Sequence, residues 1–387
     1  MNNRFKINQS LFNWISGATA VGVLTLILGV LFSERIWPNV LLAAWYITGI
    51  GFSGIMFVAI HYVSNAGWGV AIRRIPEAMF AALPIGFLLM ILVVLGAHHI
   101  YEWTHLDVVA KDPILQGKQP WLNLPGFIIR IPIYFGLWFL FGKPILNHSR
   151  KQDEDGDASH SVKSMRWSAA FLYLGGIAFV IASFDWIMSV EPHWFSTIFG
   201  FYNFAGMFDA GLAFMIIVLI YLRRGGYLPE LKNDHLHELG RYLFAFTTFW
   251  VYIWFSQHML IWYANLPEET GYYLKRHFGS FGVLAVLNIC LNWLIPFMIL
   301  MFRKTKRSEK SLLLASFIVL AGHWTDLYMM IFPPLLDTDV PVFGLMEIGV
   351  VIGMIGVTMW VVLNKISKGN MIPVKDPYLE ESLNLHT

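Results

Sequence analysis

Charged residues are scarce in this 387-residue sequence: they make up 13% of it, whereas hydrophobic residues make up 57%. Soluble domains carry about a quarter charged residues, so the composition excludes an ordinary soluble protein. A net charge of +2 offers no basic surface for nucleic acid, which is therefore not an expected partner. The single cysteine, Cys290, lies in an apolar run and excludes both a disulfide framework and a thiolate metal site built by this chain alone.

Sequence motifs for cofactors are also missing. The sequence has no C-x-x-C-H, no ferredoxin-like cysteine run, no phosphate-binding loop and no dinucleotide fingerprint. His258 and His323 could be posed as the axial pair of a b-type haem, but a second pair on the other side would have only His61. We therefore expect this chain to bind no metal and no cofactor and to contain no catalytic residue of its own.

What the sequence has instead is a series of apolar runs, each close to the roughly 20 residues that a bilayer-spanning helix needs. They predict an all-α polytopic membrane protein with ten transmembrane helices in one integral membrane domain, residues 1–387. The predicted helices are 11–32, 37–63, 77–99, 125–147, 166–189, 195–222, 241–264, 278–302, 310–332 and 341–365. The polar segment 147–166 is expected to be a solvated linker, and residues 366–387 a cytoplasmic tail.

The distribution of lysine and arginine predicts the orientation, because loops rich in these residues stay in the cytoplasm. With both termini in the cytoplasm, 21 of the 27 lysines and arginines lie on the cytoplasmic side. The six on the other side are Arg35, Lys111, Lys118, Arg130, Lys275 and Arg276. That outer side carries six tryptophans that an interfacial belt would explain: Trp37, Trp103, Trp121, Trp186, Trp194 and Trp262.

A short pattern, D-x-x-M-x-x-x-P, occurs at the ends of the fifth and ninth predicted helices. It contains Asp185 and Pro192 in the first copy and Asp326 and Pro333 in the second. Because the two helices are four apart, an even number, helices 2–5 and 6–9 would form a parallel repeat. We expect two four-helix bundles, 37–189 and 195–332, with helix 1 (11–32) and helix 10 (341–365) at the periphery.

Several titratable residues lie inside the predicted helices, where an ionised aspartate costs about 3 kcal/mol and so normally faces a bundle interior or a cavity. Asp185, His258, His323 and Asp326 fall in the outer half of the membrane, and Asp209 lies near mid-depth. His323 and Asp326 share a helix face, and with Tyr328 and His258 they could form a chain of exchangeable protons. Two further candidates, Arg130 and Glu347, lie within two turns of the outer ends of their helices.

Three stretches make the sequence resemble a known family. They are "SFDWIMSVEPHWFSTIFGFY" at 183–202, "WFSQHMLIWYANLPEE" at 254–269 and "GHWTDLYMMIFPP" at 322–334. Together with the ten predicted helices they are similar to the F subunits of alternative complex III, a bacterial quinol:cytochrome c oxidoreductase whose membrane subunits belong with the NrfD/polysulfide reductase chains. The resemblance covers nearly the whole chain.

The resemblance implies a cofactor-free subunit in the bacterial cytoplasmic (inner) membrane, surrounded by lipids. Its partners would be the family's larger, NrfD-like, quinol-binding membrane protein and periplasmic subunits that carry c-type haems and iron-sulfur clusters. The family's F subunits are regarded as scaffolds that can also conduct protons. The resemblance assigns no role to an individual residue, so the roles considered for Asp185, Asp209, His258, His323 and Asp326 rest on depth and chemistry.

The same sequence features are compatible with three other functions. The outer polar residues could border a quinone site, where His258, His323 or Asp326 would accept protons as a quinol is oxidised. A stand-alone secondary transporter is a different class, and it would be active alone in liposomes. A purely structural anchor is the third alternative, and it predicts that neutralising the deep acids leaves turnover per assembled complex unchanged.

Overall fold

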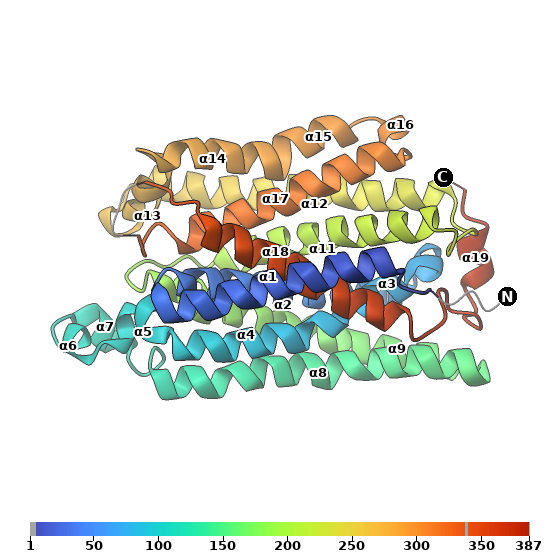
Figure 1. The fold of residues 1–387 in the computed structure, drawn as a ribbon, viewed down its shortest axis with the longest axis horizontal. Coiled ribbons are helices and arrows are strands. Elements are labelled where there is room, and N and C mark those ends of the chain that lie inside the picture. Colours follow the sequence, from blue (N-terminus) through green and yellow to red (C-terminus); the bar gives the residue numbers. More distant parts are fainter. Residues whose placement is uncertain (1–4, 337–339, 387) are drawn as a thin grey trace.

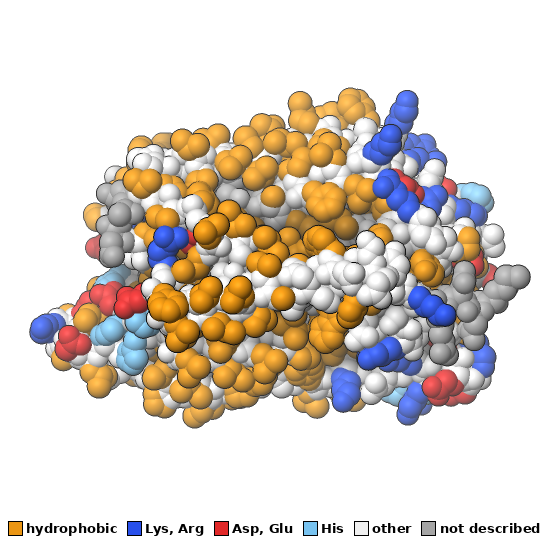
Figure 2. Space-filling model, in the orientation of Figure 1, with side chains coloured by type: hydrophobic (Ala, Val, Ile, Leu, Met, Phe, Trp, Pro, Cys, Tyr) orange, Lys and Arg blue, Asp and Glu red, His pale blue; other side chains and the backbone are white. Residues whose placement is uncertain are grey.

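The computed structural model describes residues 5–336 and 340–386, and within these residues all regular secondary structure is helical. Nine helices in the described part of the chain are long and apolar enough to cross a membrane. They lie lengthwise beside one another (Figure 1). Hydrophobic side chains cover the middle of the visible face, while lysines and arginines gather toward the end that holds both termini (Figure 2). The chain is therefore a multi-pass membrane protein by length, composition and surface.

The nine helices coincide with nine of the ten predicted spans. They are α1 (Gln9–Phe32), α2 (Ile36–Val63), α3 to α4 (Arg74–Leu95), α8 (Leu124–Asp155), α9 to η5 (Ser159–Val190), α11 (Phe199–Arg224), α14 to α15 (Phe281–Leu300), α17 (Glu309–Ile331) and α18 (Leu345–Ile366). The predicted seventh span, 241–264, lies within α12 (Asn233–Ala264), which is not one of the nine. Tryptophans, tyrosines and polar side chains such as Gln257 lower the hydropathy of α12 below that of its neighbours.

Shorter helices lie at the two ends of the molecule. We call the end with both termini the terminal end and the opposite one the far end (Figure 1). The far end holds α5 (Ala97–Ile100), α6 (Leu106–Val109), α7 (Pro113–Lys118) and α13 (Pro267–His277), and the terminal end holds α16 (Arg303–Lys306) and α19 (Leu379–Leu383). Arg4 and Thr387, which the sequence places in the predicted cytoplasmic segments, lie outside the described residues.

Two helices form the centre of the molecule. The apolar window of α2 is completely buried inside the protein, and that of α11 is 89% buried. On one side α2 packs against α4 and α9, on the other α11 packs against α12 and α17, and α2 and α11 contact each other. α1 lies against α18, where Gly22 and Gly353 meet backbone to backbone. Burial of α2 and α11 explains why small and apolar residues fill both, since neither has a face toward lipid.

Most of the predicted linker at 147–166 is helical. α8 continues to Asp155 and α9 begins at Ser159, so the turn is confined to the residues around Gly156, whose φ is 77°. Asp153 of α8 forms an ion pair with Arg74, and the Nδ1 atoms of His148 and His160 are 3.0 Å apart. The polar composition of this segment indicated contact with water. It does not exclude a helix, because a helix can extend beyond the membrane.

The expected tryptophan belt also needs correction. Trp121 and Trp262 are 49% and 71% exposed, as belt residues would be. The other four are buried, because their rings pack between helices and loops of the far end. Trp103, for example, donates a hydrogen bond to the carbonyl oxygen of Ser189 at 3.1 Å.

Candidate functional site

Two buried aspartates lie at the far end of the molecule, each near the end of a helix. Asp185 belongs to α10 (Gly176–Trp186) and Asp326 belongs to α17, and their exposed fractions are 0% and 1%. They are the aspartates of the repeated sequence pattern. An aspartate buried this deeply needs hydrogen-bond or charge partners, and the partners of the two differ in kind.

The carboxylate of Asp326 is held by neutral donors from three other helices. Its Oδ1 accepts hydrogen bonds from the Tyr202 hydroxyl of α11 and, at 2.8 Å, from the Asn288 side-chain amide of α14. Its Oδ2 accepts a hydrogen bond from the Trp250 indole of α12 at 3.1 Å. No ion pair to Asp326 occurs among the described residues. The carboxyl group is therefore well hydrogen-bonded without a neighbouring cation to fix its charge.

The carboxylate of Asp185 is instead paired with a cation. Arg130 of α8 donates from Nε to Oδ2 at 2.5 Å and from a terminal nitrogen to Oδ1 at 3.1 Å. Tyr134 and Trp121 add hydrogen bonds of 2.7 Å each. The Arg130 guanidinium also lies over the Trp121 ring, 4.5 Å from its centre. A bidentate pair of this kind fixes the orientation of both side chains.

A small cavity of about 30 Å³ borders Asp326 and opens between α12, α13 and α17. Such a volume holds about two water molecules. Polar side chains line it: Tyr202, Gln257, Tyr273, Arg276, His277 and Asn288. Burial, together with the charges of His258 and Arg276, lowers the pKa of His277, in the far-end helix α13, to about 4. His277 is therefore neutral at pH 7 and can both accept and donate a hydrogen bond.

Arg276 closes the cavity on the side of the far-end loops. Its guanidinium donates to the carbonyl oxygens of Met329 at 2.7 Å and Met330 at 3.1 Å, at the end of α17. It also pairs with Glu191 at 2.5 Å. Arg276 is 3% exposed, so these acceptors satisfy a buried cation.

Asp209 lies deeper, in the middle of α11. Its side chain is 2% exposed, and its Oδ1 has no hydrogen-bond partner among the described residues. His323 of α17 is 2% exposed and its Nδ1 is likewise without a partner. The His323 ring packs against that of Tyr46, with 5.1 Å between ring centres. Asp209 and His323 thus each have one buried polar atom, Oδ1 and Nδ1, that accepts or donates no hydrogen bond among the described residues.

The expected chain through His258, His323, Asp326 and Tyr328 is not formed by hydrogen bonds among the described residues. The Tyr328 hydroxyl bonds to the backbone of Val342 on the side of α18. The His258 ring stacks on that of Trp254, with 5.6 Å between ring centres. It also contacts the His277 ring, with 5.0 Å between ring centres. A shared helix face did not predict a shared hydrogen bond, because His323 packs against Tyr46 of α2 while Asp326 bonds to side chains of α11, α12 and α14.

Glu347, the last candidate from the sequence, connects two helices through its hydrogen bonds. It accepts two hydrogen bonds from Arg35, at 2.8 and 2.9 Å, and one from Asn39 at 3.1 Å. The backbone N–H of Gly344 donates to it at 2.7 Å, so Glu347 also caps the start of α18. These contacts join α2 to α18 at the far end.

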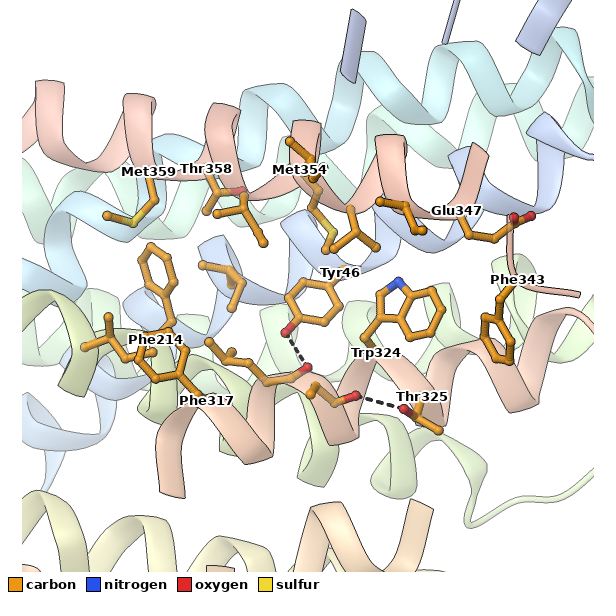
Figure 3. A pocket seen from close by; sticks show the side chains of 18 residues that line it. Tyr46, Phe214, Phe317, Trp324, Thr325, Phe343, Glu347, Met354, Thr358 and Met359 are labelled. Carbon is orange, nitrogen blue, oxygen red and sulfur yellow. Dashed lines mark hydrogen bonds between the residues drawn. The ribbon is translucent and has the colours of Figure 1, made fainter. Parts of the chain in front are cut away.

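Another pocket lies between α2, α11, α17 and α18 and has a volume of about 560 Å³ (Figure 3). Its lining is almost entirely apolar, with Tyr46 and Trp324 at its centre and Glu347 at its far end. The Tyr46 hydroxyl is already engaged, since it donates to the carbonyl oxygen of Leu320 at 3.0 Å. We call this pocket the apolar groove.

Sequence reasoning missed the partners that define the two aspartate sites. Tyr202, Trp250 and Tyr134 looked like ordinary aromatic residues of apolar helices, and Arg276 looked like a loop cation. Their roles depend on which helices are neighbours, which no local pattern encodes. Asn288 and Arg130 were the partners with a local signal, because a polar or charged residue in an apolar run indicates a contact between helices.

Comparison with protein-family models and with curated proteins finds no match to this sequence. Among the described residues, no three His, Cys, Asp or Glu side chains are grouped as a metal site would need. The candidate site is therefore the Asp326 cluster with its cavity. The Asp185 ion pair is a second buried polar site at the same end of the molecule.

Proposed function

We propose that this chain is an integral membrane subunit of a bacterial quinol:cytochrome c oxidoreductase of the alternative complex III kind. It would lie in the cytoplasmic (inner) membrane with both termini in the cytoplasm and scaffold the larger, NrfD-like protein that oxidises quinol. Quinol, c-type haems and iron-sulfur clusters would belong to the other subunits. The three family-like stretches support this proposal, and so does their position, since they contain Asp185, Tyr202 and Asp326 of the two buried sites.

The proposal includes ten transmembrane helices arranged as two parallel four-helix bundles, with α12 as the seventh. Packing within the two halves supports it: α2 contacts α4 and α9, as α11 contacts α12 and α17. In addition, α8 contacts α9 and α10, as α14 and α15 contact α17. The two sets of contacts correspond helix by helix under a shift of four helices.

Capping of the two equivalent helix ends agrees with a repeat. The carbonyl oxygen four residues after Asp185, that of Ser189, accepts a hydrogen bond from Trp103 in the loop after α4 and α5. The carbonyl oxygen four residues after Asp326, that of Met330, accepts one from Arg276 in α13, which follows α12. Unrelated side chains thus perform the same backbone role at corresponding places.

We assign the two aspartates different roles within this function. Asp326 has only neutral donors and borders a cavity large enough for water, so its carboxyl can bind and release a proton without breaking an ion pair. This observation carries the proposal of proton conduction in the outer half of the membrane. Asp185 is fixed by Arg130, so its role is to hold α8 and α10 together.

The first test purifies the full chain from intact membranes through an affinity tag in mild detergent. Co-purification of c-type haem, seen in the absorbance spectrum, together with quinol:cytochrome c reductase activity would support a redox-complex subunit. A colourless chain that elutes alone would overturn that assignment. Transport assays of the isolated chain in liposomes would then test a secondary transporter.

The second test separates conduction from scaffolding within the assembled complex. Asp326→Asn keeps the shape of the side chain but cannot release a proton, and we expect proton uptake per electron to fall while the haem content per complex is unchanged. Asp107→Asn, an exposed residue of α6, is the matched control. Unchanged proton uptake in Asp326→Asn would leave the chain with a purely structural role.

A further inference from the structure

The apolar groove is a cleft between two helices that diverge. α17 and α18 approach each other at the far end and separate toward the terminal end, with α2 and α11 behind them (Figures 1 and 3). Large side chains line the cleft without filling it, among them Phe214, Phe317, Ile352 and Met354. An empty apolar cleft forfeits dispersion contacts along its walls, so a membrane-embedded protein is more stable when an apolar molecule occupies it.

The length of the groove matches one leaflet of a bilayer. Along α18 it runs from Glu347 to Met359, which is about 18 Å at 1.5 Å per residue. Half of a hydrocarbon core is about 15 Å. A helix of a partner protein that crosses the whole membrane would need about 30 Å, so the groove is too short to be its seat, whereas a chain that enters from one surface fits its length.

A hydrogen-bond donor of α17 faces into the groove without a partner in the described part of the protein. The indole nitrogen of Trp324 is on the side of the ring turned toward α18 (Figure 3), and no described protein group accepts a hydrogen bond from it. Trp324 is two turns before the end of α17 at Ile331. A ligand with a carbonyl oxygen just below the membrane surface would satisfy this donor.

The far end of the groove carries a cation at headgroup level. Glu347 closes that end and binds Arg35, whose side chain is 40% exposed. A phosphate located above Glu347 would therefore meet the exposed part of a guanidinium that is already held in place, and guanidinium groups bind phosphate well.

We propose that the groove between α17 and α18 is a binding site for one phospholipid of the far-end leaflet. One acyl chain lies along Phe317, Ile352 and Met354, an ester carbonyl accepts the Trp324 indole hydrogen bond, and the phosphate lies beside Arg35. A quinone ring fits less well, because it would need donors at both of its opposed carbonyls: the Tyr46 and Thr325 hydroxyls already donate to backbone carbonyls, and Thr358 lies beyond Tyr46 from Trp324 (Figure 3). This proposal requires that the chain spans a membrane, but it does not depend on the proposed redox function.

Native mass spectrometry of the full chain, released from mild detergent at increasing collision energy, tests the proposal. The wild type should retain one adduct of phospholipid mass. Ala321→Phe places a ring into the groove from α17 and should remove that adduct. Ala169→Phe is the matched control, since Ala169 is exposed on α9 and does not line the groove.

A second variant keeps the test valid if Ala321→Phe does not fold. Trp324→Phe retains the ring and removes only the donor, so we expect phospholipid affinity to fall about three- to tenfold, the effect of one hydrogen bond. Retention of no lipid by the wild type, an adduct with the mass of a prenylated quinone, or equal loss in Ala169→Phe would each overturn the proposal. None of these results bears on co-purification with haem, which tests the proposed function separately.

Discussion

At the scale of single residues, three buried aspartates differ in what surrounds them. Asp185 has a bidentate arginine, Asp326 has three neutral donors, and Asp209 has an oxygen with no described partner. The cost of burying a carboxylate is offset by a cation in the first case and only by hydrogen bonds in the second. Substitution of the same kind should therefore have different effects at the three positions.

Asp185→Asn should destabilise the protein, whereas Asp209→Asn should not. Asparagine at 185 leaves the Arg130 guanidinium, whose side chain is 14% exposed, without its counter-charge, at a cost of about 3 kcal/mol. Asparagine at 209 removes a carboxyl that no described cation pairs with, so the Tm should stay equal or rise. Thermal unfolding of both variants in one detergent measures the difference, and equal Tm values would contradict these assignments.

Lowering the pH should destabilise the folded protein, because protonation of His277 at the far end is unfavourable in the folded state. Its folded-state pKa of about 4 lies below the usual 6.5, so the folded protein binds fewer protons than the unfolded chain between these values. The contribution of neutral His277 is complete above pH 6.5 and is lost as the pH falls toward 4. The Tm of the wild type should thus decrease from pH 7 to pH 5, and His277→Gln should reduce that slope. An identical slope in the variant would show that other groups cause it.

At the scale of elements, the contact of α1 with α18 depends on glycine. A Cβ at Gly353 would lie 2.3 Å from the Cα of Gly22, which no real contact permits. Gly353→Ala should therefore push α1 away from α18 and cost about 1–3 kcal/mol. Gly17→Ala on the open side of α1 is the control, because a Cβ there meets nothing within 4 Å and alanine favours a helix. Limited proteolysis of α1 measures the effect, and equal cleavage of both variants would argue against a glycine-dependent contact.

The elements were largely predictable from the sequence, because the length of an apolar run and the thickness of a bilayer determine where a helix can lie. The extension of α8 to Asp155 was not predictable in this way, since its last residues are polar and are held by contacts such as Arg74 with Asp153. In the candidate site, the position of Asp185 and Asp326 near the ends of two apolar helices could be read from the sequence. Their pairing with Arg130, Tyr202 and Trp250 could not, because these contacts join helices far apart in the chain.

At the scale of the whole molecule, the segment after α18 joins the two halves of the terminal end. Asp376 forms an ion pair with Arg73 near the start of α3, at 2.7 Å. The carbonyl oxygen of Ser382 lies 3.0 Å from the His235 ring of α12, and the Ser382 hydroxyl donates to Trp68. The tail thus contacts helices from both sides of the α2 and α11 centre, and its attachment should depend on its one buried ion pair.

Asp376→Asn tests that dependence. Arg73 is 7% exposed and also donates to the Tyr62 hydroxyl, so removal of the carboxylate leaves a buried guanidinium without a counter-charge and should cost about 3–5 kcal/mol. The tail should then detach, and a carboxypeptidase should trim the C-terminus faster than in the wild type. Glu380→Gln is the matched control, because Glu380 is exposed and forms no ion pair among the described residues. If both variants are trimmed at the wild-type rate, hydrogen bonds such as those of Ser382 hold the tail and the Arg73 pair is dispensable for its attachment.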